Sequence, residues 1–124
     1  MLAHAVVVWL HGSAHEKLGV DTFDWPGNLF IYIVIVAAPF FAMVLLWTKL
    51  HSSGVWLLLG SMAGSLLFGA YNHFVAITPD HVSHLPAGDS QTLFQITAAL
   101  LVIVEIFGGW IAWRALRERR QAKI

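Results

Sequence analysis

The 124-residue sequence contains no cysteine, and only 11% of its residues are charged. The absence of cysteine excludes disulfide bonds, thiolate metal ligands and a cysteine nucleophile. The low charge excludes an ordinary water-soluble domain, in which about 25% of the residues are charged. Seven basic residues balance seven acidic residues, so there is no excess of positive charge to attract a polyanion. We therefore expect no nucleic-acid partner.

Apolar residues are in excess, because hydrophobic residues make up 58% of the chain. They are concentrated in three stretches, at residues 29–47, 55–77 and 93–113. A helix needs roughly 17–25 residues to cross a bilayer, and each stretch reaches that length. None shows the continuous polar face of a soluble helix. The predicted fold is an all-α integral membrane protein with three transmembrane helices in contact with lipid.

Basic residues lie at one end of these predicted spans. Five of them fall in a tail at residues 114–124, and Lys49 lies in the turn between the first two spans. The loop at residues 78–91 contains only acidic charges. The positive-inside rule then places the tail and the turn in the cytoplasm. We predict a multi-pass protein of the cytoplasmic (inner) membrane with an extracytoplasmic N-terminus.

Residues 1–19 are expected to form a shorter helix, since they lack proline and end at Gly19. The apolar run within them, residues 5–10, is too short to span a bilayer. The sequence favours an amphipathic helix on the extracytoplasmic surface, or a half-spanning helix packed on the bundle. The whole chain, residues 1–124, is thus predicted to be one membrane domain.

Small residues at four-residue spacing mark one face of the second span, among them Gly60, Gly64 and Ser65. Residues at this spacing share a helix face, and small ones allow another helix to approach closely. The row formed by Ser61, Ser65 and Gly69 continues to His73, which is therefore predicted to point into a helix seam. The third span has a comparable row through Glu105. Two such seams favour other transmembrane subunits or a homo-oligomer as partners.

Glu105 is the only aspartate, glutamate, lysine or arginine inside the three predicted spans. An acidic group at this depth costs on the order of 2.5–3.5 kcal/mol, so it is usually paired or functional. One interpretation is a protonated carboxyl that donates to Ser65, or to the Ile35 carbonyl freed by Pro39. The other is a proton, ion or cofactor site. No basic residue is expected at the same depth in this chain.

Histidine is frequent, with seven residues. Six are predicted on the extracytoplasmic side: His4, His11, His15, His73, His81 and His84. In a helix, His4, His11 and His15 share one face, and the spacing of His11 and His15 allows both to bind one metal ion. His81 and His84 form a second pair beside Asp80, a further ligand or a carboxylate that orients one. The predicted metal ligands are His11, His15, His73, His81 and His84.

Imidazoles without thiolates suit a transition-metal ion such as copper, zinc or iron. The alternative for each histidine is a polar role at the membrane interface, where imidazole is tolerated. The outward histidines could also form a pH switch. Cofactor binding by His73 and Glu105 is a further possibility. Ligation of haem or chlorophyll by His73 is less favoured, since haem b normally needs a second histidine from a helix.

Three functions agree with these patterns. The first is a metal-binding membrane module for metal handling or for a metalloenzyme. The second is a non-catalytic accessory subunit of a larger respiratory, photosynthetic or oxygenase-type membrane complex. The third is a homo-oligomeric proton-coupled transporter that uses Glu105. The zinc-protease motif H-E-x-x-H and the serine-hydrolase motif G-x-S-x-G are both absent, so hydrolytic chemistry is not indicated. Whether the protein is an enzyme stays open.

Overall fold

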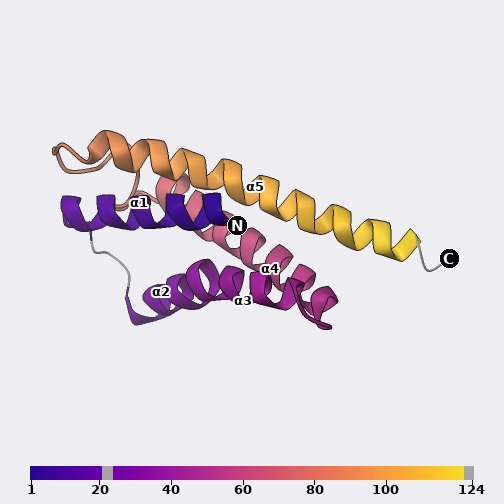
Figure 1. The fold of residues 1–124 in the computed structure, drawn as a ribbon. Helices are drawn as coiled ribbons and strands as arrows, with labels where there is room; N and C mark the ends of the chain where they lie inside the picture. The colour runs from indigo at the N-terminus through magenta and orange to yellow at the C-terminus, as the bar shows by residue number, and fades with distance from the viewer. Residues whose placement is uncertain (21–23, 122–124) are drawn as a thin grey trace.

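A computed structural model describes residues 1–20 and 24–121, and within these residues the chain forms helices and no strands. The elements, drawn in Figure 1, follow one another in this order: α1 (Leu2–Leu18), α2 (Trp25–Phe30), η1 (Ile31–Ala37), α3 (Ala38–Leu46), α4 (His51–Ala70), η2 (Tyr71–Val75) and α5 (Gln91–Gln121). The segments η1 and η2 are π-helical and continue their neighbouring α-helices without a break.

Three of the resulting helices are long and apolar enough to cross a membrane: Trp25–Leu46, His51–Val75 and Gln91–Gln121. This confirms the all-helical class and the three span-length helices. Each begins before the predicted apolar stretch, because polar residues extend a helix without adding to its hydropathy. The third also continues into the basic tail, where Arg114 and Glu118 form an ion pair one turn apart. Residues 122–124 of that tail lie outside the described residues.

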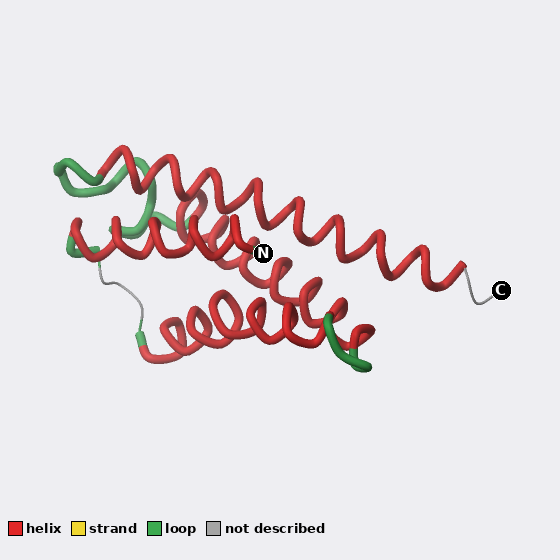
Figure 2. The backbone as a smooth tube through the Cα atoms, viewed as in Figure 1, coloured by secondary structure: helices red, strands yellow, loops and turns green. Residues whose placement is uncertain are grey.

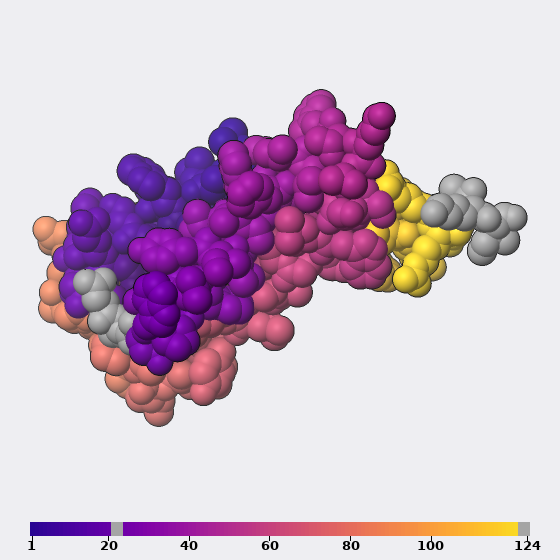
Figure 3. Space-filling view, turned by 90° about the horizontal axis from the view of Figure 1, so that it is seen from below, coloured from indigo at the N-terminus to yellow at the C-terminus, as the bar shows by residue number. Residues whose placement is uncertain are grey.

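The helices pack around α4 and α5 (Figure 1). The helix α3 packs on α4, and α1 packs on α5, running in the opposite direction along its N-terminal half. The turn between α3 and α4 lies at one end of the bundle, and the loop between η2 and α5 lies at the other (Figure 2). The C-terminal part of α5 extends beyond the other helices (Figure 3).

The N-terminal helix α1 ends where the sequence predicts. Gly19 adopts a left-handed conformation with φ 62°, and its N–H donates to the Glu16 carbonyl. The face turned to the protein contains His4 and His11, both buried, whereas Trp9 is 70% exposed. The imidazoles of α1 therefore point inward and away from the surroundings. The depth of α1 in a membrane stays a prediction.

The π-helical turns coincide with two sequence features. The segment η1 immediately precedes α3 and its Pro39, which lacks an N–H and would clash with the carbonyl four residues earlier in a regular helix. The irregularity expected at Pro39 is therefore a π-helical segment. The segment η2 carries His73 and closes with the Ala76 N–H donating to the Tyr71 carbonyl at 2.7 Å.

Two hydrophobic clusters form the core. The first joins α3, α4 and α5 near the α3–α4 turn, and contains Ala42, Val55, Leu58, Met62, Ala112 and Leu116. The second lies at the other end, between α1, α5 and the loops, and contains Ala14, Val20, Leu85, Phe94 and Ala98. The second cluster supports the histidines described below.

The small-residue seams are used inside the chain. A Cβ atom added at Gly64 would lie 3.0 Å from Val34 of η1, and one added at Gly108 would lie 2.8 Å from the Met62 sulfur. We expected these seams to need a second chain, but at Gly64 and Gly108 they are closed by intramolecular packing, whereas Gly60 is exposed. Partners in the membrane stay a prediction, but the packing at Gly64 and Gly108 does not support it.

Replacing Gly54 with alanine should destabilise the bundle by about 1–3 kcal/mol. The new Cβ would lie 3.0 Å from backbone atoms of Ala42 and Leu46, which have no room to move. Gly60→Ala is the matched control, because within the described residues nothing lies within 4 Å of its Cβ position. Thermal unfolding in one detergent measures both variants. Equal melting temperatures would contradict the packing at Gly54.

Candidate metal centre

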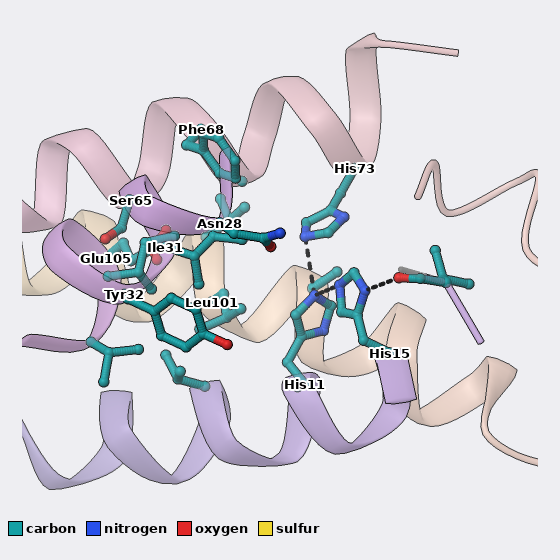
Figure 4. Close-up of a pocket in the computed structure, with 18 of the residues that line it drawn as sticks. His11, His15, Asn28, Ile31, Tyr32, Ser65, Phe68, His73, Leu101 and Glu105 are labelled. Carbon is teal, nitrogen blue, oxygen red and sulfur yellow. Dashed lines mark hydrogen bonds between the residues drawn. The ribbon is translucent and has the colours of Figure 1, made fainter. Parts of the chain in front are cut away.

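The structure brings three histidines together from two distant segments (Figure 4). His11 and His15 lie one turn apart on α1, and His73 lies on η2. The Nε2 atom of His11 is 3.0 Å from Nε2 of His73 and 3.2 Å from Nε2 of His15. The three potential ligand nitrogens all lie within 4.8 Å of one another. We call these three residues the histidine cluster.

The hydrogen bond to Thr97 determines which nitrogen of His11 carries its proton. The Thr97 hydroxyl lies 2.7 Å from the Leu93 carbonyl, to which it must donate. It therefore accepts from Nδ1 of His11, 2.9 Å away. The Nδ1 atom is thus the protonated one, and Nε2 of His11 keeps its lone pair.

The same reasoning holds for the other two imidazoles. Nδ1 of His15 lies 3.0 Å from the Val20 carbonyl, and Nδ1 of His73 lies 3.1 Å from the Asp80 carbonyl. A carbonyl oxygen can only accept, so both Nδ1 atoms donate. When each Nε2 carries no proton, the three imidazoles turn Nε2 lone pairs toward one another. Lone pairs at 3.0–3.2 Å repel unless a cation lies between them.

A carboxylate adjoins the histidine cluster. Asp80 is 1% exposed, with Oδ1 3.2 Å from Nε2 of His15 and Oδ2 3.1 Å from Nδ1 of His73. Among the described residues, neither oxygen has a partner with hydrogen-bond geometry. The loop that carries Asp80 is fixed over η2 by the Val82 N–H, which donates to the His73 carbonyl at 3.0 Å. Asp80 thus adds a buried negative charge beside the three lone pairs.

The spacing of these atoms agrees with a coordination sphere. Nitrogen ligands at about 2.0–2.1 Å from a tetrahedral zinc ion are about 3.3 Å apart. Two of the nitrogen–nitrogen distances, 3.0 and 3.2 Å, are close to that value, as is the 3.2 Å from His15 to Asp80. Metal-bound histidines usually donate their other N–H to a carbonyl or carboxylate, as the histidine cluster does. The group can therefore hold a metal ion.

The surroundings keep His11 neutral. The pKa of His11 is lowered from 6.5 to about 2, mainly by burial and also by the neighbouring imidazoles of His73 and His15, against a smaller opposing effect of the Phe94 carbonyl. Phe94 is fully buried, and its ring centroid lies 4.6 Å from those of His11 and His15 and 5.3 Å from that of His73. At neutral pH, His11 is in the form that binds a metal.

His81 and His84 contact each other instead of the histidine cluster. Their Nδ1 atoms lie 3.2 Å apart, and both contact the Ser83 hydroxyl, at 2.8 and 3.3 Å. His84 is exposed and His81 partly buried. The loop places Asp80 beside His73, whereas the side chains of His81 and His84 point away from the histidine cluster. In the described part of the chain, the only group of three or more potential ligands is the histidine cluster.

Glu105 has a partner that we did not expect. Its Oε1 lies 3.7 Å from Nε2 of His4, and both residues are 3% exposed. The expectation that no basic residue lies at this depth is wrong, because α1 packs along α5 and brings His4 down to Glu105. The shared helix face of His4, His11 and His15 was the signal in the sequence. Within the described residues the Ser65 hydroxyl has no hydrogen-bond partner, so the expected Glu105–Ser65 bond is not formed.

A cavity of about 710 Å³ adjoins both groups. Residues from α1, α2, η1, α4, η2 and α5 line it, including all of the histidine cluster, Ser65 and Glu105. Figure 4 shows the histidine cluster at one end of the cavity and Ser65 and Glu105 at the other. The candidate metal centre therefore has an open side.

The position of His73 favours a small ion over a macrocycle. An axial ligand presents its nitrogen to the face of a haem or chlorophyll. Nε2 of His73 instead faces His11 at 3.0 Å, and Nδ1 faces Asp80. The ring centroids of His11 and His73 are 4.7 Å apart, which leaves no room for a macrocycle between them.

None of the protein-family models, curated proteins and solved structures that we compared with the chain matches it. A functional proposal therefore rests on the geometry of the site alone.

Phe94→Ala should destabilise the protein by about 3–5 kcal/mol, because it removes a fully buried ring beneath the three imidazoles. Phe107→Ala is the matched control on the same helix, since Phe107 is 60% exposed and its loss leaves no internal cavity. Chemical unfolding in detergent, followed by circular dichroism, gives both free energies. If Phe107→Ala lowered the free energy of unfolding as much as Phe94→Ala, this description of the core would be wrong.

Proposed function

We propose that the protein is a membrane-embedded metal-binding module in which His11, His15 and His73 hold one transition-metal ion. The single observation that carries the proposal is the convergence of three Nε2 lone pairs, each imposed by an N–H···O bond on the opposite side of its ring. Such an arrangement is unfavourable without a cation and favourable with one. Asp80 is proposed as a fourth ligand or as the carboxylate that balances the charge.

The donor set supports Zn(II), Cu(II) or Fe(II). Neutral imidazole suits these ions, and a carboxylate is also acceptable to them. Copper(I) is less suited, because the chain has no cysteine and none of its three methionines lines the cavity or joins the histidine cluster. One ion bound by three imidazoles and one carboxylate would carry a net charge of about +1, which is easier to bury than a free dication.

We further propose that the three long helices span a cytoplasmic membrane, with the C-terminus in the cytoplasm. The basic end of α5 and Lys49 support this orientation. The η2–α5 loop lies at the opposite end of the bundle from the α3–α4 turn (Figure 2). The histidine cluster, which this loop covers, would then face the extracytoplasmic side and receive its metal from there.

The open side of the centre favours a reactive or exchanging metal over a purely structural one. Structural zinc sites are closed by four protein ligands, whereas catalytic sites leave one position open. Here all three histidines also line the cavity, so a further molecule has access to the ion. Metal delivery and metalloenzyme chemistry are both consistent with this arrangement.

Protein purified without added chelator should contain about one transition-metal ion per chain by elemental mass spectrometry. His15→Ala and His73→Ala should each reduce that content at least tenfold, since each removes one of three nitrogens. The double variant His81→Ala, His84→Ala is the matched control and should retain the metal, because this pair lies outside the histidine cluster.

Loss of the metal in the control but not in His15→Ala would transfer the site to the loop and refute the proposal. A metal-free protein that gains no thermal stability from added Zn(II), Cu(II) or Fe(II) would also refute it. The interpretations as an accessory subunit or a transporter would then take precedence.

Thr97→Val should weaken metal binding by about tenfold to a hundredfold without removing a ligand. The substitution preserves the shape of the side chain but removes the hydroxyl that accepts from Nδ1 of His11. Thr92→Val, at an exposed position on the same helix, is the control. Competition with a chelator of known affinity measures both dissociation constants. Unchanged affinity in Thr97→Val would show that Thr97 does not orient His11.

A further inference from the structure

The far end of the cavity contains a polar group that the metal proposal does not use. Ser65 is completely buried, and among the described residues its hydroxyl has no hydrogen-bond partner. Ser61, one turn earlier on the same face of α4, is also buried, but its hydroxyl donates to the Leu58 carbonyl at 3.0 Å. A serine in a helix can thus satisfy its own hydroxyl, and Ser65 does not. Ser65 lines the cavity and Ser61 does not.

Within the described residues, the Glu105 carboxyl, at the same end of the cavity as Ser65 (Figure 4), has only a long contact with His4. The 3.7 Å between His4 and Glu105 exceeds the length of a hydrogen bond, and Nε2 of His4 has no partner in the part of the chain that the structure describes. Glu105 lines the cavity and lies at the same end as Ser65 (Figure 4). Buried polar groups left unpaired cost free energy. A ligand that both donates and accepts one hydrogen bond would pair with Ser65 and Glu105.

The remaining walls of the cavity are mainly apolar. They include Ile35, Leu101 and Val102. The volume of about 710 Å³ falls within the range of pockets that enclose small organic molecules, about 300–1,000 Å³. An apolar body that extends along these walls would therefore fit the cavity better than a wholly polar solute.

The cavity opens on an apolar flank of the bundle. Trp25 and Tyr32 line it and yet are 75% and 67% exposed. The opening lies between α1, which packs on α5, and the α2–η1 segment, whose η1 part packs on α4. If the three long helices span a membrane, this flank faces lipid, and a ligand enters from the bilayer.

We propose that the cavity binds a lipid-soluble molecule with an apolar body and one hydroxyl group, placed between Ser65 and Glu105. The apolar body lies along Ile35, Leu101 and Val102, with its far end toward the histidine cluster. The site is built from polar and apolar groups that exist without a metal. The inference therefore does not rest on the proposed metal function.

Photo-crosslinking in lipid nanodiscs tests this site, with a diazirine analogue of 1-dodecanol as the probe. We expect labelling of Leu101 and Val102 that saturates and that excess 1-dodecanol suppresses. Labelling of Ile103 and Phe107, which are 58% and 60% exposed, should not saturate, because bulk lipid reaches them. Dodecane should not compete. The relative potency of 1-dodecanol and 4-octylphenol as competitors distinguishes a chain alcohol from a ring hydroxyl.

Ser65→Val should reduce the saturable labelling about fivefold to tenfold, as expected for the loss of one hydrogen bond. Ser61→Val is the matched control and should leave it unchanged, since Ser61 lies outside the cavity. Val102→Trp, which fills the cavity without removing a polar group, should also abolish it. Thermal unfolding shows whether each variant is folded.

Labelling that does not saturate at any residue would overturn the proposal. Equal competition by dodecane would overturn it as well, because the hydroxyl would then contribute nothing. The assay is repeated on protein stripped of metal with a chelator and on metal-loaded protein. If the protein binds no metal, the metal function is refuted. Labelling that is retained in such a protein would still support the lipid site.

Discussion

The architecture of the candidate centre depends on three N–H···O bonds on the outer side of the imidazole rings. Each Nδ1 donates to an oxygen whose position is fixed. The acceptors are the Thr97 hydroxyl, which itself donates to the Leu93 carbonyl, and the backbone carbonyls of Val20 and Asp80. These acceptors belong to α5, to the residue after Gly19 and to the η2–α5 loop. The packing of distant segments thus sets the direction of every Nε2 lone pair, and the chemistry of the cluster follows from it.

The same packing explains why polar residues face inward on α1. In water or at a lipid surface, imidazoles would be expected on the polar side of an amphipathic helix. Here they meet polar partners inside the bundle, and Trp9 occupies the outer side. The Phe94 ring packs against the imidazoles of His11 and His15, within a hydrophobic cluster that also contains Ala14 and Ala98. The polar face of α1 thus contacts the rest of the bundle, through side chains such as His11.

Composition and hydropathy were sufficient to predict the all-helical class and the three long helices. The row of small residues through Ser65 to His73 correctly predicted a buried imidazole, and the spacing of His11 and His15 correctly placed both on one face. The loop histidines show the limit of such reasoning. Spacing within a turn defines which side chains are neighbours, but the direction of His81 and His84 depends on how the loop crosses η2. The pairing of Glu105 with His4 likewise required the position of α1 along α5, which no local pattern encodes.

The cavity links the two polar groups that sequence reasoning treated separately. One group is Glu105, which lies 3.7 Å from His4, and the other is the histidine cluster. Without the cavity, these two groups would have no connection. The gap between α1 and η1 places both on the walls of one space. The local conformations do not predict this space, because it lies between α1, which packs on α5, and η1, which packs on α4.

The order of the segments along the chain has a consequence for biogenesis. The histidine cluster takes its first two members from α1 and its third from η2, whereas Thr97 and Phe94 belong to α5, which follows both of them in the chain. A nascent chain that ends before α5 would have all three imidazoles, but it would lack the Thr97 hydroxyl that accepts from His11 and the Phe94 ring that packs against the imidazoles. The geometry of the histidine cluster is therefore complete only after α5 has packed on α1, so the proposed metal site would form late in folding.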